Sequence, residues 1–285
     1  MSVSALLLIL AAAVAHATWN LLAKRAGGGA VFVWLYAMTA SILWAPLTVP
    51  VFAGFWPRLV PIDWVFMVGS GLIHTAYFVM LQRGYRTGDL SLIYPLARGT
   101  GPALATVAAM FLFAERPTGL ALTGAALIVI SIVMFSNPAG ARPSHVGEGM
   151  FFGVGTGMLI AFYTLWDKHA VAALGIPPLV QEWFTSLTRA VCLLPLAWRN
   201  AGELREDWGK RRAAALWIGA LNPLAYVLVL FAMKFSPVSY VAPAREVSIL
   251  FGALFGAQFL KEGDRRRRLA AASVMVAGVC LLAAG

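Results

Sequence analysis

Two arginines lie in stretches that are otherwise apolar enough to cross a membrane. Arg98 is in "IYPLARGTGPAL" and Arg245 is in "YVAPAREVSIL", each shortly after a proline. An arginine at the centre of a membrane helix costs at least about 2.5–3.5 kcal/mol, so such residues face other protein groups or a water-filled cavity. A guanidinium holds a carboxylate or phosphate through two parallel hydrogen bonds. We therefore predict that Arg98 and Arg245 together form a receptor for an anion.

Other interpretations of these charges stay open. Arg98 and Arg245 could instead join adjacent helices by bonding backbone carbonyls. Glu246 follows Arg245 directly, and it could neutralise an arginine of the empty site, receive a substrate amine or take up a proton. A structural ion pair explains Glu246 equally well. Arg189, two helical turns after Glu182 in a third apolar stretch, is a further candidate for substrate binding, with an ion pair as the alternative.

The composition places the chain in a membrane. Of its 285 residues, 60% are hydrophobic and only 12% are charged, whereas a soluble globular chain is about one quarter charged. Apolar runs of about 20 residues, the length that spans hydrocarbon as a helix, recur along the chain. The runs predict helices at residues 3–23, 31–51, 63–83, 90–113, 118–136, 148–167, 179–198, 213–232, 238–260 and 268–284. We therefore expect an all-α membrane protein with ten transmembrane helices.

Prolines near the two arginines predict kinks in helices four and nine. Pro95 and Pro243 cannot donate a hydrogen bond to the carbonyls of Ser91 and Ser239, four residues earlier. Freed carbonyls at membrane depth are tolerated where they meet protein or line water. The kinks therefore support a cavity beside the arginines.

The two halves of the chain resemble each other. "ATWNLLAKRA" (17–26) aligns with "AFYTLWDKHA" (161–170), and further matches follow in the same order. The polar segment "SNPAGARPSHVGEG" separates the halves. We predict a first five-helix repeat over residues 1–136, a linker over 137–147 and a second five-helix repeat over 148–285.

The odd number of spans in each repeat has a geometric consequence. The two copies enter the bilayer from opposite sides, which is the inverted arrangement common in secondary transporters. Equivalent residues then lie near a pseudo-two-fold axis at the middle of the membrane. Arg98 aligns with Arg245, His74 with Asn222, and Trp19 with Tyr163. We expect these equivalent positions to contribute to substrate binding.

Each of these polar and aromatic candidates also has a structural interpretation. His74 and Asn222 could hydrogen-bond a polar ligand or each join two helices. His74 could also titrate near neutral pH, so protons remain a candidate coupling ion. Trp19 and Tyr163 could stack on an aromatic or amine-bearing substrate, or pack against neighbouring helices.

A resemblance to a known family rests on three of these features. The two five-helix repeats, the early W-N-x-x-x-K pattern at residues 19–24 and the acidic residues Glu115 and Glu262 that close helices four and nine resemble the drug/metabolite transporter superfamily, in its ten-helix EamA family. The resemblance covers nearly the whole chain. It implies a small-molecule carrier, often an exporter of amino acids or related metabolites, with a central cavity lined by both repeats.

The expected function is therefore secondary transport. We expect export of a small carboxylate-bearing metabolite, such as an amino acid or a derivative, across a bacterial inner membrane by alternating access. The alternatives are a multidrug carrier for lipophilic cations, which would need a membrane carboxylate such as Glu246 or Glu182, and a carrier working in the uptake direction.

Other classes of protein fit the sequence less well. The formal net charge of +10 comes without a basic helix or an aromatic-studded basic groove, so we expect no nucleic-acid partner. Four scattered histidines, and the lack of HExxH or paired-Asp motifs, argue against a membrane enzyme and against a metal site or cofactor. The expected partners are a small-molecule metabolite and membrane lipid, with the chain acting as a monomer or a homodimer.

Basic residues predict the orientation of the chain in the membrane. Apart from the three buried arginines, four basic residues lie on the side of the termini and fifteen lie on the opposite side. Cytoplasmic loops carry the excess of lysine and arginine. The count predicts both termini outside the cytoplasm, although the family resemblance implies cytoplasmic termini.

Overall fold

The computed structural model describes residues 1–87, 90–135, 146–251 and 265–285, and within these ranges it contains helices and no strands. The α-helices are α1 (Val3–Ala26), α2 (Ala30–Phe55), α3 (Pro61–Thr87), α4 (Leu90–Leu112), α5 (Gly119–Phe135), α6 (Val146–Ala172), α7 (Pro178–Arg199), α8 (Ala201–Phe235), α9 (Val238–Ala244) and α11 (Arg265–Ala284). Two 3-10 helices are η1 (Trp56–Arg58) and η4 (Arg245–Val247).

The all-α fold predicted from the apolar runs is confirmed. In hydrocarbon every backbone polar group must bond within the protein, and a helix meets this need inside its own segment. Five of the described helices are long and apolar enough to cross a membrane. Their lengths follow from the uninterrupted apolar runs of the sequence.

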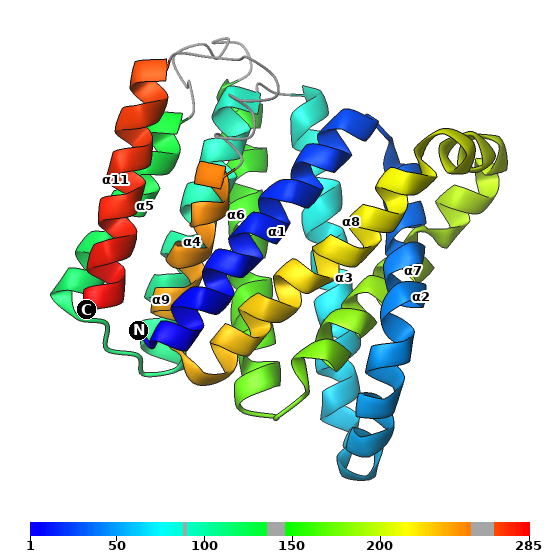
Figure 1. The fold of residues 1–285 in the computed structure, drawn as a ribbon, viewed down its shortest axis with the longest axis horizontal. Helices are drawn as coiled ribbons and strands as arrows, with labels where there is room; N and C mark the ends of the chain where they lie inside the picture. Colours follow the sequence, from blue (N-terminus) through cyan, green and yellow to red (C-terminus); the bar gives the residue numbers. More distant parts are fainter. Residues whose placement is uncertain (88–89, 136–145, 252–264) are drawn as a thin grey trace.

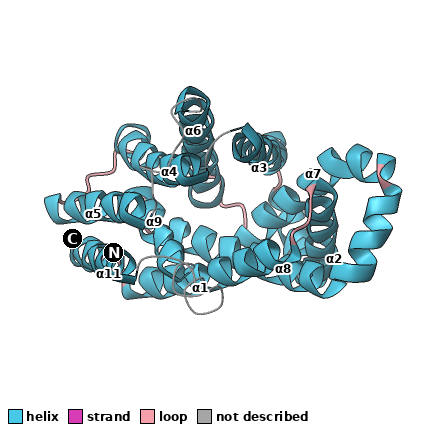
Figure 2. Cartoon of the chain, turned by 90° about the horizontal axis from the view of Figure 1, so that it is seen from above, coloured by secondary structure: helices cyan, strands magenta, loops and turns pink. Residues whose placement is uncertain are grey.

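The two halves of the chain run in opposite directions and interleave. In Figure 1, α1 starts at the end of the molecule that holds both termini, whereas α6 starts at the opposite end and runs back toward them. α4 packs along α6, α1 along α8, α5 along α11 and α2 along α7, as Figures 1 and 2 show. Each of these pairs joins a helix of the first half to a helix of the second half. Residues of both halves therefore meet along the middle of the bundle.

Helix α8 differs from the sequence prediction at its start. α8 begins at Ala201, well before the expected start at residue 213. Its first turns are highly charged, so they do not belong to an apolar run. Arg211 pairs with Asp207, one turn earlier on α8. Arg211 also donates a hydrogen bond of 2.8 Å to the carbonyl of Ala26 at the end of α1. This polar extension is thus held by side-chain contacts and by capping of a neighbouring helix.

The ninth predicted helix is interrupted where the sequence placed a kink. α9 ends at Ala244, directly after Pro243, and the chain continues as η4 over Arg245–Val247. α4 stays α-helical over its length, so the described part of helix four has no equivalent 3-10 turn. The predicted end of helix nine at residue 260 lies outside the described residues.

Helix α9 and η4 form the most enclosed segment of the fold. All residues from Val238 to Val247 are buried, and α9 contacts α1, α4, α5, α6, α8 and α11. In Figure 2, α9 lies inside the outline formed by its neighbours. A group carried by η4 is therefore surrounded by protein.

The turn between α8 and α9 is held by a lysine and a glutamate from other helices. The Lys168 amine on α6 donates to the carbonyls of Met233 and Ser236, at 2.6 and 2.9 Å. The carboxylate of Glu115, just after α4, accepts from the backbone N–H groups of Val238 and Ser239, at 2.7 and 2.8 Å. A cation thus caps the end of α8 and an anion caps the start of α9, as the helix dipoles favour.

Glycines bring α4 and α6 close together. A Cβ on Gly157 would lie 2.7 Å from the Cβ of Thr100 and 3.1 Å from the backbone nitrogen of Gly101, and a Cβ on Gly153 would lie 2.7 Å from the Cβ of Leu96. Such contacts are possible only without side chains at these positions. The crossing fixes the position of α4, which carries Arg98.

Candidate functional site

The two predicted receptor arginines meet at one carboxylate. Arg98 comes from α4 in the first half, and Arg245 and Glu246 come from η4 in the second half. The Nε atom of Arg98 lies 2.8 Å from Oε2 of Glu246, and the Nε atom of Arg245 lies 3.5 Å from Oε1 of the same side chain. The Glu246 side chain is 0% exposed. We call Arg98, Arg245 and Glu246 the arginine centre.

Polar side chains orient the two guanidinium groups. Arg98 donates to the hydroxyl of Ser248 at 3.1 Å, and Arg245 donates to the phenolic oxygen of Tyr163 on α6 at 3.1 Å. The Tyr163 ring also lies beneath the Arg245 guanidinium, 5.5 Å from ring centroid to Cζ. His16 on α1 lies near enough to interact electrostatically with both arginines.

The arginines contact Glu246 as ion pairs, without well-formed hydrogen bonds. In the described part of the chain, neither carboxylate oxygen of Glu246 accepts a hydrogen bond of good geometry, although both are fully buried. Buried carboxylate oxygens normally accept several hydrogen bonds. The arginine centre therefore holds a carboxylate between two guanidinium groups and leaves its hydrogen-bonding capacity unused.

A second group of polar side chains surrounds Asp167 on α6. Its carboxylate accepts hydrogen bonds from the Tyr226 hydroxyl at 2.6 Å and from the Gln181 amide at 2.9 Å, and it lies 3.3 Å from Nε2 of His74. Beside this group, the hydroxyls of Ser70 and Thr185 lie 2.9 Å apart. We call Asp167, His74, Tyr226 and Gln181 the aspartate cluster.

Two aromatic rings connect the arginine centre to the aspartate cluster. The imidazole of His74 stacks on the ring of Tyr163, with centroids 4.0 Å apart. Tyr163 bonds Arg245 through its hydroxyl, and His74 contacts Asp167 through Nε2. Two packed side chains therefore connect Arg245 to Asp167.

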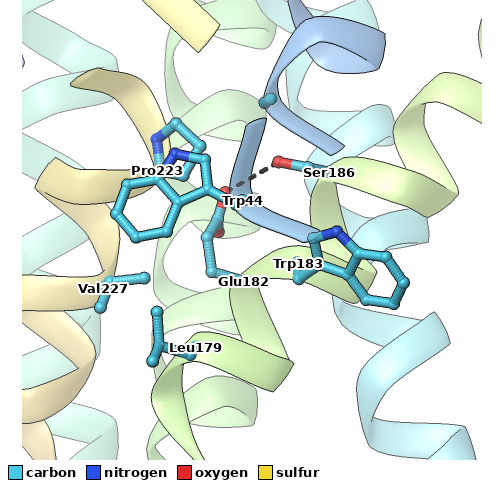
Figure 3. A pocket seen from close by; sticks show the side chains of 8 residues that line it. Trp44, Leu179, Glu182, Trp183, Ser186, Pro223 and Val227 are labelled. Carbon is cyan, nitrogen blue, oxygen red and sulfur yellow. Dashed lines mark hydrogen bonds between the residues drawn. The ribbon is translucent and has the colours of Figure 1, made fainter. Parts of the chain in front are cut away.

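A third carboxylate, Glu182, lies in a narrow pocket between α2, α7 and α8. Figure 3 shows its side chain beside Trp44, with Trp183 close by, and accepting a hydrogen bond from Ser186 at 3.0 Å. The pocket is lined by Ala40, Trp44, Leu179, Glu182, Trp183, Ser186, Pro223 and Val227. It is too narrow to hold a water molecule in this conformation.

The structure brings some predicted site residues together and leaves others apart. Arg98, Arg245, Glu246, Tyr163 and His74 form one continuous set of contacts, as described above. The other three predicted residues lie elsewhere: Trp19, Asn222 and Arg189.

Trp19, Asn222 and Arg189 lie in three different environments. Trp19 packs against His16 and the apolar cluster around Phe32. Asn222 is half-buried on α8 and has no hydrogen bond in the described part of the chain. Arg189 is half-buried on α7 and acts electrostatically on Glu182 and His74. Arg189 is thus close enough to Glu182 to interact with it electrostatically, and substrate binding by Arg189 stays a prediction.

Sequence reasoning missed Asp167 because of where it ended a helix. The sixth predicted helix ends at residue 167, which puts Asp167 at its last position, but α6 continues to Ala172. Its position inside "YTLWDKHAVA", directly after Leu165 and Trp166 and before a further apolar stretch that starts at Ala170, is a signal that could have identified it. The partners Tyr226 and Gln181 come from other helices, and no sequence spacing indicates them.

The described residues hold no group of three or more histidine, cysteine, aspartate or glutamate side chains that could bind a metal ion.

The fold and the buried charges define a polytopic helical membrane protein whose two halves share a site. The model of the EamA-like transporter family matches residues 3–137 and again residues 147–284. The chain belongs to the EamA-like transporter family, and the repeated match confirms an architecture of two equivalent halves. It is a membrane transporter of the drug/metabolite kind.

Comparison with solved structures supports the fold. A structure titled only "Crystal structure of protein" is 17% identical and has a TM-score of 0.73. The match covers 99% of this chain and 96% of that chain. At this identity the likeness shows a shared fold. No curated protein matches the sequence.

Proposed function

We propose that the protein is a secondary carrier for a small carboxylate-bearing metabolite, such as an amino acid or a derivative, which it exports across a bacterial inner membrane. The observation that supports this proposal is the convergence of Arg98 and Arg245, one from each half, on the carboxylate of Glu246. Two guanidinium groups that hold a buried carboxylate of the chain have the geometry and charge to hold that of a substrate.

Glu246 takes the place of the substrate in the empty carrier. With two arginines and one glutamate, the centre keeps one net positive charge, which attracts an anion. An incoming carboxylate displaces Glu246 from one or both guanidinium groups. The two arginines belong to opposite halves of the inverted repeat. Relative movement of the halves therefore changes the positions of the two guanidinium groups around the substrate, as alternating access requires.

A thermal-shift screen tests the substrate class. Purified protein is heated with amino acids, other carboxylates, phosphorylated metabolites and lipophilic cations. Carboxylates are expected to raise the melting temperature of the wild type and to have no effect on Arg98→Gln, because a neutral amide cannot pair with the anion. The matched control is Arg205→Gln, an exposed arginine on α8, which should respond like the wild type. Equal responses of wild type and Arg98→Gln would contradict the proposal.

Lipophilic cations are the second candidate, because of Glu182. A buried carboxylate beside Trp44 and Trp183 has the composition of a cation site. The candidate ranks second because Arg189 interacts with Glu182 and because the pocket is narrow. A shift caused by cations alone in the same screen, and lost in Glu182→Gln, would favour it.

We also propose that both termini lie outside the cytoplasm. The charged start of α8 supports this orientation, because Arg205, Lys210, Arg211 and Arg212 lie at the end of the molecule opposite the termini. Alkaline phosphatase fused after Gly285 is expected to be active, since this enzyme folds only outside the cytoplasm, whereas green fluorescent protein at the same position should stay dark. The reverse pattern would show cytoplasmic termini.

A further inference from the structure

Asp167 is a buried carboxylate that the proposed substrate receptor does not use. Its side chain is 0% exposed, and its contacts are with neutral donors and a histidine: Tyr226, Gln181 and His74. An aspartate deep in a membrane helix is rare and marks function. The question is what the carboxylate binds in a carrier whose anion receptor lies elsewhere.

The charges in the middle of the described bundle balance. The three arginines Arg98, Arg189 and Arg245 face the three carboxylates Asp167, Glu182 and Glu246. When all six groups are ionised the set is neutral, so a substrate that carries a carboxylate without a compensating ammonium adds one negative charge to it. Burying an uncompensated charge is costly, so binding of the substrate favours uptake of one proton.

Asp167 is the carboxylate best placed to receive that proton. Glu246 lies between two arginines, and Glu182 has Arg189 on its own helix. Among the described contacts, Asp167 is joined to Arg245 across Tyr163 and His74.

Titratable groups surround Asp167 on each element packed against it. They are His74 from α3, Tyr163 from α6, Glu182 and Arg189 from α7, Tyr226 from α8 and Arg245 from η4. Of these side chains, His74 and Tyr226 touch Asp167. The group of the two that titrates closer to neutral pH in its unperturbed form is the imidazole of His74. It is therefore the partner through which a proton reaches or leaves the carboxylate.

We infer that Asp167, in contact with His74, is the proton-binding site that couples the carrier to a proton gradient. The inference rests on the proposed transport function and names the coupling ion and its site. Substrate capture at Arg245 changes the contact with Tyr163, which stacks on His74 beside Asp167. The proton site and the substrate site are thus coupled through contacting side chains.

Infrared difference spectroscopy tests proton binding without any substrate. Full-length protein in lipid vesicles is titrated from alkaline to acidic pH, and the carbonyl stretch of protonated carboxylic acids is recorded. The wild type is expected to gain a band that Asp167→Asn lacks. Glu148→Gln, which changes an exposed carboxylate on the same helix, is the matched control and should keep it. An unchanged band in Asp167→Asn would overturn the inference.

The histidine contact supplies a second variant. In His74→Gln the midpoint of the Asp167 band is expected to move, because the imidazole nitrogen that lies 3.3 Å from the carboxylate is removed. If Asp167→Asn does not fold, the band midpoint of His74→Gln tests the inference in its place. An unchanged midpoint in His74→Gln would overturn the inference.

Vesicle transport separates this inference from the proposed function. The probe is a radiolabelled amino-acid mixture, measured first as exchange against unlabelled mixture and then as accumulation driven by a pH gradient. Asp167→Asn is expected to keep exchange and to lose accumulation at least tenfold. Retained accumulation in the variant would overturn the proton site. Absence of exchange in the wild type would contradict amino acids as substrates, while the infrared result would still decide proton binding.

Discussion

Glu246→Gln is expected to lower the free energy of unfolding by about 3–5 kcal/mol, the usual cost of removing one partner from a buried ion pair. The change leaves Arg98 and Arg245 buried near each other without the carboxylate between them. Glutamine has nearly the same shape, so the loss measures charge and not packing. Thermal and denaturant unfolding in detergent gives the difference, with Glu148→Gln as a control expected to be unchanged.

Added acetate separates a receptor from a structural ion pair in this variant. If the arginine centre is open to substrates, acetate takes the place of the missing side chain and restores part of the lost stability of Glu246→Gln. The same concentration of acetate should affect the wild type less, because Glu246 already occupies the centre. A destabilised variant that acetate does not rescue would show that the ion pair only holds α4 to η4.

Gly157→Ala is expected to destabilise the protein by about 1–3 kcal/mol, as overpacking of a close contact does. The added Cβ would meet Thr100 Cβ at 2.7 Å, the Gly101 nitrogen at 3.1 Å and the Ala97 carbonyl oxygen at 3.2 Å. Two of these atoms belong to the backbone, and backbone atoms move aside less easily than the end of a side chain. α4 must therefore move away from α6.

The same substitution elsewhere on α6 gives the control. A Cβ on Gly147 has no atom within 4 Å, so Gly147→Ala is expected to be neutral or to stabilise by up to about 1 kcal/mol through higher helix propensity. Unfolding midpoints of the two variants measure the difference. Equal effects of both changes would show that the α4–α6 crossing is looser than its geometry indicates.

The sequence predicted those features that depend on local hydrophobicity. Apolar runs gave the helices because spanning segments must be long, apolar and internally bonded. The same criterion failed at the start of α8, which is helical although it is polar. Arg211 stabilises this segment by capping α1 and by pairing with Asp207. The criterion also ended α6 too early, and so left Asp167 out of the candidate site.

Only the part of the candidate site that is repeated in both halves could be predicted from the sequence. Alignment of the halves placed Arg98 opposite Arg245, and the structure brings both to one carboxylate. The alignment could not indicate that Glu246 contacts Arg98, which lies on a different helix. Contacts between helices depend on packing angles, and residue spacing in the sequence does not determine those angles. Trp19 aligns with Tyr163 but packs with His16, since the residues around the two positions differ.

The turn between α8 and α9 limits how the bundle can rearrange. Lys168 holds the last carbonyls of α8, and Glu115 holds the first amides of α9, through four hydrogen bonds. Neither helix can leave this end of the molecule alone, because each bond ties the turn to α6 or to the end of α4. In a carrier that opens at the end holding the termini, these bonds are therefore broken, or α4, α6 and the turn move along together.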